Sequence, residues 1–570
     1  MPPKSTRRQL IAAFLSAGAA AMNLAPKRES AAPNVPLPPG TMAIGAFEDI
    51  PRLSIPEGTA RIRTAGYHPG DRAGGADYVA VDPPAGGADV GTARSANRRW
   101  WRIDEAFPDA CQFGARGLGA ASDDTAAIAG AVAFLHKGGG GTLFFRTREG
   151  PAEAGAYYNV TSPIPLLPGV SLQGDARRPK IKNLVAEGGA GVQQVFLPGN
   201  FHPAFTQELT YRDCGAIAAG RRATLRDPAH AAAFAVGDQV LIASSATGTT
   251  GSFSIPNYAI LNEVEAVVGA TLVFRRPIDV SFVGGVARLA SVNGRNGVPL
   301  FFYSDASLSD LDIETPHFWI SDSACRSVRF VRLTVSSRAS VTYGNCFQHV
   351  DWESCVSYFS ETAGEQSHNS LRTRARDSKF IFKPMRGVAP AEGLGLQERA
   401  RHVLYENCEF DFGGTTLTNP IIQTGDCQDV VFRNCRGKIR SPTFDSSHLI
   451  LIGTTADASF PSSGVVVEGG EYEAMTCARW AWIEGNLLAG NRENGLRNVR
   501  FRGTSAVEAI RFNNSIGGCF SIGCVYPTGA LGFSGTCRGN VFTGNILRGA
   551  VAVDETTARH NLIRNNARLR

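Results

Sequence analysis

Short stretches in which apolar and polar residues alternate return repeatedly after residue 325. With the last apolar residue of each stretch (Thr in one copy) as its marker, they recur at 330, 352, 373, 405, 432, 467, 501, 542 and 563. A period of two predicts β-strands with one buried face, and the Asn, Gly, Ser or Cys that often follows predicts a turn. The shortest intervals, 21 and 22 residues, suit one coil of a solenoid. We therefore expect an all-β chain, folded as a parallel β-helix whose coils stack strand on strand.

Charged residues beside the markers test this register. In six successive copies the outward residue alternates in sign: Glu353, Arg374, Glu406, Arg433, Glu468 and Arg502. The preceding column alternates in the same way through Arg329, Asp351 and Arg372. Opposite charges on neighbouring strands stabilise a sheet. We interpret them as a structural ladder on a solvated wall, which requires the six to lie in one column.

A second apolar stretch precedes most returns of the first. Its copies are Ser340–Gly344, Gly395–Glu398, Pro420–Thr424, His448–Ile452, Trp480–Glu484 and Ala509–Asn513. From marker 373 the intervals widen to 32, 27, 35, 34 and 41 residues, so the extra residues must leave the coil as loops. Long loops on a rigid scaffold often carry binding and catalysis. We place a groove on the middle coils, between about residues 358 and 490.

The candidate site residues lie near those loops. Unlike the ladder, the carboxylates there have no basic partner in register. The catalytic candidates are Glu361, Glu365, His368, Glu398, Asp445 and Glu484. The candidates for substrate binding are Arg372, Lys383, Arg386, His448, Trp480 and Trp482. The two tryptophans either stack on sugar rings or pack in the core.

Two chemistries are open to these residues. A pair of carboxyl groups hydrolyses a glycosidic bond, with a separation of about 5 to 5.5 Å for retention and about 6.5 to 9.5 Å for inversion. A lyase needs a base that removes the proton beside a uronate carboxylate and a cation that stabilises the developing charge. His368 with Arg372, Lys383 and Arg386 suits the second scheme.

Composition limits the class of protein. The 570 residues are 43% hydrophobic and 19% charged, enough for a long core, and the net charge of +6 is mild for this length. Nucleic acid binding is therefore disfavoured, whereas attraction to an acidic polymer stays open. Residues 1–40 resemble an export signal with paired arginines, Arg7 and Arg8, followed by a Pro-rich linker. We expect an exported protein, periplasmic or extracellular, without a membrane span after removal of the signal.

The twelve cysteines mostly follow the repeat. We expect free, buried thiols at the coil corners, although stacked neighbours such as Cys325 and Cys346 are candidates for a disulfide. No Cys or His spacing suggests a metal site.

The chain before the repeat divides into smaller parts. Residues 41–104 form a small module, and the β-helix domain occupies 105–570. Asp123 or Asp124 caps a helix whose apolar face includes Ile128, Ala131 and Leu135, and this helix covers the open end of the solenoid. Residues 206–290 predict a small β insertion.

The opening of this domain resembles that of the pectate-lyase superfamily. The resemblance rests on Phe113–Ala115, Asp123–Thr125, Gly139–Phe145, Tyr158–Val160 and Gly169–Gly174, with Leu118 where relatives often carry Asp. It covers about residues 111 to 175 closely and implies a right-handed parallel β-helix. Members include secreted glycosidase-related enzymes and phage tailspike depolymerases.

The resemblance also bears on function. It implies an enzyme that cleaves a polysaccharide as a lyase or a glycoside hydrolase, with calcium open only by analogy with pectate lyases and no other cofactor expected. The alternatives are a non-catalytic carbohydrate-binding β-helix, a tailspike depolymerase on a virion tail, and an epimerase that acts on polymer uronates. Secreted relatives are often monomers and tailspikes are trimers, so both states stay open.

Overall fold

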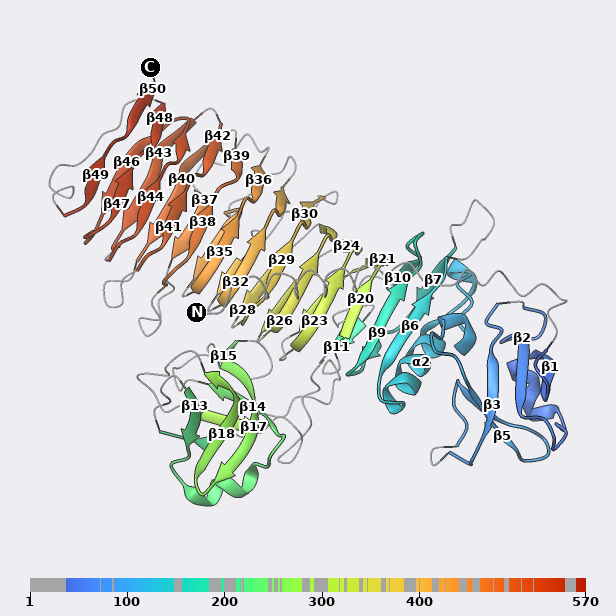
Figure 1. Ribbon diagram of the computed structural model, residues 1–570. Helices are drawn as coiled ribbons and strands as arrows, with labels where there is room; N and C mark the ends of the chain where they lie inside the picture. Colours follow the sequence, from blue (N-terminus) through green and yellow to red (C-terminus); the bar gives the residue numbers. More distant parts are fainter. Residues whose placement is uncertain are drawn as a thin grey trace, which may run out of the picture.

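The computed structural model describes residues 37–71, 73–84, 87–147, 156–183, 196–198, 212–215, 217, 220–243, 249–250, 255–256, 259–278, 288–291, 306–316, 318–321, 325–337, 342–345, 347–359, 365–368, 370–383, 396–398, 400–412, 420–425, 427–439, 448–453, 462–474, 476–485, 492–503, 505–515, 517–548 and 560–569. Three walls of parallel strands form one long solenoid (Figure 1). Right-handed crossovers are the rule for parallel strands, and the predicted right-handed parallel β-helix is confirmed.

Each coil contributes strands to the walls in turn. The first wall contains β6 (Gly141–Phe145), β9 (Val170–Gly174), β20 (Ala306–Ser309), β23 (Cys325–Val331), β26 (Phe347–Glu353), β29 (Arg374–Arg376), β32 (Arg401–Glu406), β35 (Gln428–Arg433), β38 (Val466–Glu468), β41 (Gly495–Arg497), β44 (Phe520–Ile522), β47 (Val541–Thr543) and β49 (Leu562–Arg564). The second wall contains β7 (Tyr157–Val160), β10 (Lys180–Asn183), β21 (Asp312–Thr315), β24 (Thr334–Ser337), β27 (Val356–Phe359), β30 (Lys379–Phe382), β33 (Glu409–Asp411), β36 (Arg436–Ile439), β39 (Glu471–Ala474), β42 (Arg500–Arg502), β45 (Val525–Tyr526), β48 (Ile546–Arg548) and β50 (Ala567–Leu569). The third wall contains β22 (Trp319–Ser321), β25 (Thr342–Asn345), β28 (Glu365–His368), β31 (Leu396–Glu398), β34 (Ile422–Gly425), β37 (His448–Gly453), β40 (Thr476–Glu484), β43 (Ser505–Asn513) and β46 (Ala530–Ser534), while β8 (Ile164–Leu166) pairs with β11 (Phe196–Pro198).

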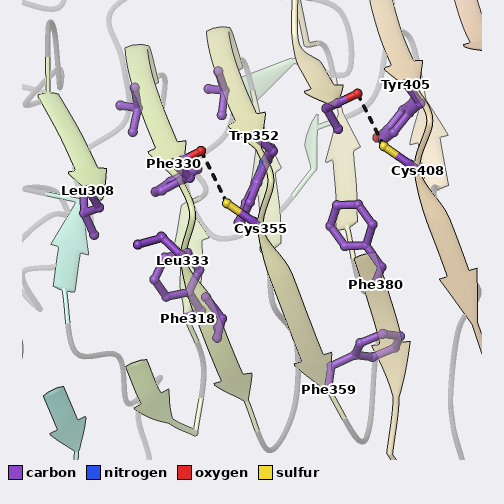
Figure 2. Packing of buried hydrophobic residues seen from close by; sticks show 14 of the residues in the cluster. Leu308, Phe318, Phe330, Leu333, Trp352, Cys355, Phe359, Phe380, Tyr405 and Cys408 are labelled. Atoms are coloured by element: carbon purple, nitrogen blue, oxygen red, sulfur yellow. Dashed lines mark hydrogen bonds between the residues drawn. The ribbon is translucent and has the colours of Figure 1, made fainter. Parts of the chain in front are cut away.

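The inward side chains stack along the solenoid because consecutive coils stay in register. Phe330 and Trp352 have ring centroids 4.3 Å apart, and Tyr405 lies 4.7 Å from Phe432 with an interplanar angle of 2°. Figure 2 shows Leu308, Phe330, Trp352 and Tyr405 along this wall, and the register places the small Ala375 between the last two. Such offset or parallel ring pairs add to the stability that comes from burying apolar area.

One residue in left-handed conformation turns the chain from the first wall to the second. Ser354, Asp377, Asn407 and Asn434 all have φ between 50° and 55° at this corner. Each donates its backbone N–H to the following coil, as Ser354 does to the Arg376 carbonyl over 3.0 Å. Asn and Asp tolerate this conformation better than most residues, which explains the polar residue that follows many of the repeats.

The charge ladder is real, but two of its six predicted members were wrong. Glu353 pairs with Arg376 rather than Arg374, and Glu468 pairs with Arg497 rather than Arg502. Likewise Asp351 pairs with Arg374 and not Arg372. The column of the first wall is therefore Glu353, Arg376, Glu406, Arg433, Glu468 and Arg497, again alternating in sign.

The second wall carries its own ladders, which were not predicted from the sequence. One column runs Lys379, Glu409, Arg436, Glu471 and Arg500. Arg502, the sixth predicted ladder residue, belongs to this wall, where it pairs in register with Glu473. The error has a simple cause: the marker Phe501 lies on β42 of the second wall, and the first-wall strand of that coil is β41, with Leu496 at the inward position. The interval of 41 residues after this marker also contains an additional coil, β44 and β45.

Helix α2 (Thr125–Lys137) lies at the first coil and packs through Ile128, Ala131 and Phe134. Asp123 accepts hydrogen bonds from the backbone and the hydroxyl of Thr125 over 3.0 and 2.6 Å. The buried Asp124 instead accepts from the backbone N–H groups of residues 116, 117 and 159. Asp123 therefore holds the start of the helix, and Asp124 fixes the loops around it.

Two smaller sheets flank the solenoid. The N-terminal sheet contains β1 (Thr41–Ala46), β2 (Arg61–Gly66), β3 (Asp77–Val81), β5 (Trp100–Ile103) and β4 (Thr92–Arg94), and its core continues into α2. The insertion contains β12 (Arg212–Asp213), β19 (Arg288–Ser291), β14 (Gln239–Ala243), β17 (Ala259–Val268), β18 (Thr271–Ile278) and β13 (Gly220–Thr224), with a core of its own. It contacts the solenoid where Arg276 lies 2.8 Å from His349 and where Leu371 packs against its core.

Several cysteines are free, buried thiols, as predicted: Cys355, Cys408, Cys435, Cys477, Cys524 and Cys537. The thiol of Cys355 donates to the Phe330 carbonyl of the preceding coil over 3.4 Å (Figure 2). Burial raises the pKa of Cys355 to about 11. The suggested pair Cys325 and Cys346 lies outside the described side chains. Within the described residues, no helix is long and apolar enough to cross a membrane.

Candidate functional site

The second repeated stretch of the sequence forms the strands of the third wall. Every predicted copy of that stretch overlaps one of its strands, from β25 to β43. With the corrected register the inward positions of the first wall from 375 onward are spaced by 30, 27, 35, 29, 25, 21 and 21 residues. The longest connections of these coils, such as those after Phe382, Asp411 and Gly453, lead into or out of the third wall. This wall is therefore where long loops are available for a site.

Several predicted site residues lie outside what the structure describes. Glu361, Arg386 and Asp445 are not described, and only the backbone is described for Glu365, His368 and Glu398. Backbone register places His368 next to Glu398 on neighbouring strands. The same row continues through Gly425 and Gly453 to Glu484.

Three of the described candidates, His448, Trp482 and Glu484, lie with new neighbours on the outer face of β37, β40 and β43. Register aligns His448 with Arg479 and Glu508 in one row, and Leu451 with Trp482 and Arg511 in the next outward row. A further row aligns Glu484 with Asn513 and Ser534. We call these residues the third-wall cluster: His448, Arg479, Trp482, Glu484, Glu508, Arg511, Asn513 and Ser534.

Glu484 is the last residue of β40 and is half-buried. Its carboxylate accepts a hydrogen bond from the Asn513 side-chain amide over 3.2 Å, and Ser534 donates to Asn513 over 3.0 Å. Burial raises the pKa of Glu484, and the hydrogen bond from Asn513 acts in the opposite direction. A carboxyl group with a raised pKa is suited to proton transfer near neutral pH.

Two arginines share one carboxylate beside it. Arg479 donates to Glu508 over 2.5 Å, and Arg511 donates to the other oxygen of Glu508 through Nε and Nη2, over 3.0 and 2.5 Å. The Glu508 side chain is 12% exposed and that of Arg511 is 31% exposed. The guanidinium of Arg479 also lies over the Trp482 ring, 4.7 Å from its centroid. This group therefore holds two positive charges for one negative charge.

His448 completes the cluster as a neutral ring. Its imidazole meets the edge of Trp482 with centroids 4.4 Å apart. Burial first, and then the charges of Arg479 and Arg511, lower the pKa of His448 to about 4. Nδ1 of His448 and Nε1 of Trp482 are buried without a hydrogen-bond partner in the described part of the chain.

Three predicted binding residues have other surroundings. Trp480 is fully buried and donates to the Thr528 carbonyl over 3.0 Å, so of the two alternatives given for it the structure shows core packing and not sugar stacking. Arg372 is exposed at the corner between the third and first walls, with φ of 58°. Lys383 lies 3.6 Å from the Tyr358 ring centroid at the end of β30, outside the cluster.

Five members of the cluster were not predicted from the sequence: Arg479, Glu508, Arg511, Asn513 and Ser534. Their signal was present, because aligning Trp480–Glu484 with Ala509–Asn513 brings Arg479 beside Glu508. Among the described residues, no three His, Cys, Asp or Glu side chains lie close enough together to hold a metal ion.

The three parallel walls define the class: a parallel β-helix protein. No protein-family model matches the chain. A tailspike protein from Pseudomonas phage LKA1 is 13% identical over 74% of this chain and 82% of its own, with a TM-score of 0.39. The adhesin PfbA of Streptococcus pneumoniae is 10% identical over 81% of this chain and 97% of its own, with a TM-score of 0.42. A tailspike protein of Acinetobacter baumannii phage Fri1, a capsular polysaccharide depolymerase, is 11% identical over 93% of this chain and 75% of its own, with a TM-score of 0.40. The likeness at these values is a broad one of fold.

Proposed function

We propose that this protein is an exported polysaccharide lyase that works on the outer face of the third wall, with Glu484 as its base. The observation that carries the proposal is one half-buried carboxylate of raised pKa beside a group with surplus positive charge. In this scheme the Glu484 carboxylate removes the proton next to a uronate carboxylate. The freed electron pair forms a C–C double bond, the glycosidic C–O bond breaks, and the leaving oxygen takes a proton from the Glu484 carboxyl group or from water.

Carboxylate spacing favours elimination over hydrolysis. In the described residues, Glu398 lies three strands from Glu484 in the same row, about 14 Å at the usual strand spacing. Hydrolases need their two carboxyl groups within about 9.5 Å. Glu508 lies nearer to Glu484, but its carboxylate is bound by the guanidinium groups of Arg479 and Arg511 and is therefore not free to act as a second catalytic acid or base.

The test is incubation of the protein with a panel of acidic and neutral polysaccharides, following the absorbance of unsaturated uronates together with reducing ends. We expect both signals to rise, and we expect Glu484→Gln to lower the rate at least about a hundredfold. Glu468→Gln on the first wall is the matched control and should stay active. A rise in reducing ends without a rise in absorbance would show that the protein is a hydrolase and not a lyase. Polymer binding without either signal would favour the non-catalytic alternative, and full activity of Glu484→Gln would exclude this residue as the base.

A further inference from the structure

The two arginines and one carboxylate of the third-wall cluster have more positive charge than the fold uses. Arg511 uses Nε and Nη2 for Glu508, and Arg479 uses Nε. Neither the remaining Nη1 of Arg511 nor the two Nη atoms of Arg479 hydrogen-bond within the described residues. The ladders differ, since Arg433 lies between two carboxylates, Glu406 and Glu468. The two arginines on Glu508 therefore differ from the alternating ladder of the first wall.

From this we infer that Arg479, Glu508 and Arg511 form a subsite that binds a carboxylate of the polymer, with Glu508 orienting both guanidinium groups. A guanidinium presents two parallel N–H donors that match the two oxygens of a carboxylate. Glu508 is 12% exposed and Arg511 31%, so the acid is the enclosed member and Arg511 the accessible one. The Trp482 ring under Arg479 further restricts the guanidinium.

The subsite adjoins the proposed base. Arg511 pairs in register with Trp482, two residues before Glu484 and about 7 Å from it along the strand, whereas Arg479 lies five residues before Glu484. The accessible guanidinium of Arg511 is therefore placed to bind the carboxylate of a sugar unit at or next to the reacting one. This inference rests on the proposed function for its polymer, but it concerns binding alone.

Binding is measured with Glu484→Gln protein, so that the polymer stays intact. The probes are polygalacturonate, alginate and hyaluronate, each beside its methyl-esterified form, in which the carboxylate is capped. We expect at least one carboxylated polymer to bind more tightly than its ester. Adding Arg511→Gln or Arg479→Gln should weaken that binding about tenfold. The affinity of Arg511→Lys should lie between those of the Glu484→Gln protein and of the added Arg511→Gln variant, because lysine keeps the positive charge but lacks the two parallel N–H donors of a guanidinium.

The matched control is Arg433→Gln, which removes an arginine of similar exposure from the first wall. If Arg433→Gln weakens polymer binding as much as Arg511→Gln does, the effect comes from net charge alone and the inference is overturned. It is also overturned if no carboxylated probe binds better than its ester, or if dextran sulfate binds more tightly than every carboxylated probe with the same dependence on Arg511. Carboxylate-dependent binding by a protein without lyase activity would uphold this subsite while the proposed function fails.

Discussion

The side-chain amide of Asn513 donates to the Glu484 carboxylate over 3.2 Å, across two neighbouring strands of the third wall. A donor in this position favours the ionised carboxylate, whereas burial favours the protonated form. The two effects oppose each other, and burial is the larger, since the net shift of the Glu484 pKa is upward. Asn513 therefore reduces the upward shift of the Glu484 pKa that burial causes.

Replacing Asn513 should shift the pH dependence of the reaction. In Asn513→Ala the ionised form loses its donor, so the pKa of Glu484 rises further. A base must be ionised, and the acid limb of kcat/KM should move to higher pH by about half a unit to one unit. Ser534→Ala, which leaves the Asn513 amide in place, is the control. An unchanged acid limb in Asn513→Ala would show that Glu484 does not govern the rate.

His448 should make the fold sensitive to acid. Its pKa is about 4 in the folded protein against an ordinary value of 6.5. Between these values the unfolded chain binds the proton more readily, so stability falls as the pH drops from about 6.5 to 4. The loss should be about 2 kcal/mol, after allowance for partial exposure. His448→Phe keeps an aromatic ring against Trp482 and removes the titration.

The measurement is urea unfolding of the parent and of His448→Phe at neutral pH and near pH 4.5. The parent should lose more free energy of unfolding between the two conditions than the variant does. If both lose the same amount, the neutral His448 ring is not a source of the acid sensitivity.

The architecture could be predicted because it follows from a period. Alternation places Val403 and Tyr405 inward and Leu404 outward in β32, whatever the neighbouring coils do. Register is harder, because it depends on the length of each turn, and a shift of two residues keeps the same face inward. That explains why Arg374 was placed in the ladder where Arg376 belongs.

The site could be predicted only in part. Glu484, His448 and Trp482 were found because they sit on strands next to long connections. The pairing of Arg479 with Glu508 follows from aligning the two repeat copies, whereas the bond from Arg511 to the same carboxylate depends on side-chain packing that no sequence pattern contains. Trp480 and Trp482 are two residues apart, yet one is fully buried and the other partly exposed, which the alternation alone does not explain.

The corner cysteines should resist thiol reagents in the native protein. Burial raises the pKa of Cys355 to about 11 and that of Cys477 to about 12, so few thiolates exist at neutral pH. Labelling by a maleimide should be slow in buffer and rapid in guanidinium chloride. Cys355→Ser should fold, because Ser378 occupies the equivalent corner of the next coil. Rapid labelling of Cys355 in the native protein would show that this thiol is accessible at the corner and not enclosed.

The ladder of the first wall should respond to reversal of one charge. Arg433 lies 3.4 Å from Glu406 and 3.3 Å from Glu468, so Arg433→Glu places three acids on consecutive strands. Exposed pairs contribute little singly, and we expect a loss of about 1 kcal/mol in the free energy of unfolding at low salt. The loss should shrink at high salt because these side chains are solvated. Arg433→Lys, which keeps the charge, should lose less. A salt-independent loss of equal size in both variants would show that packing of the arginine, and not its charge, stabilises the wall.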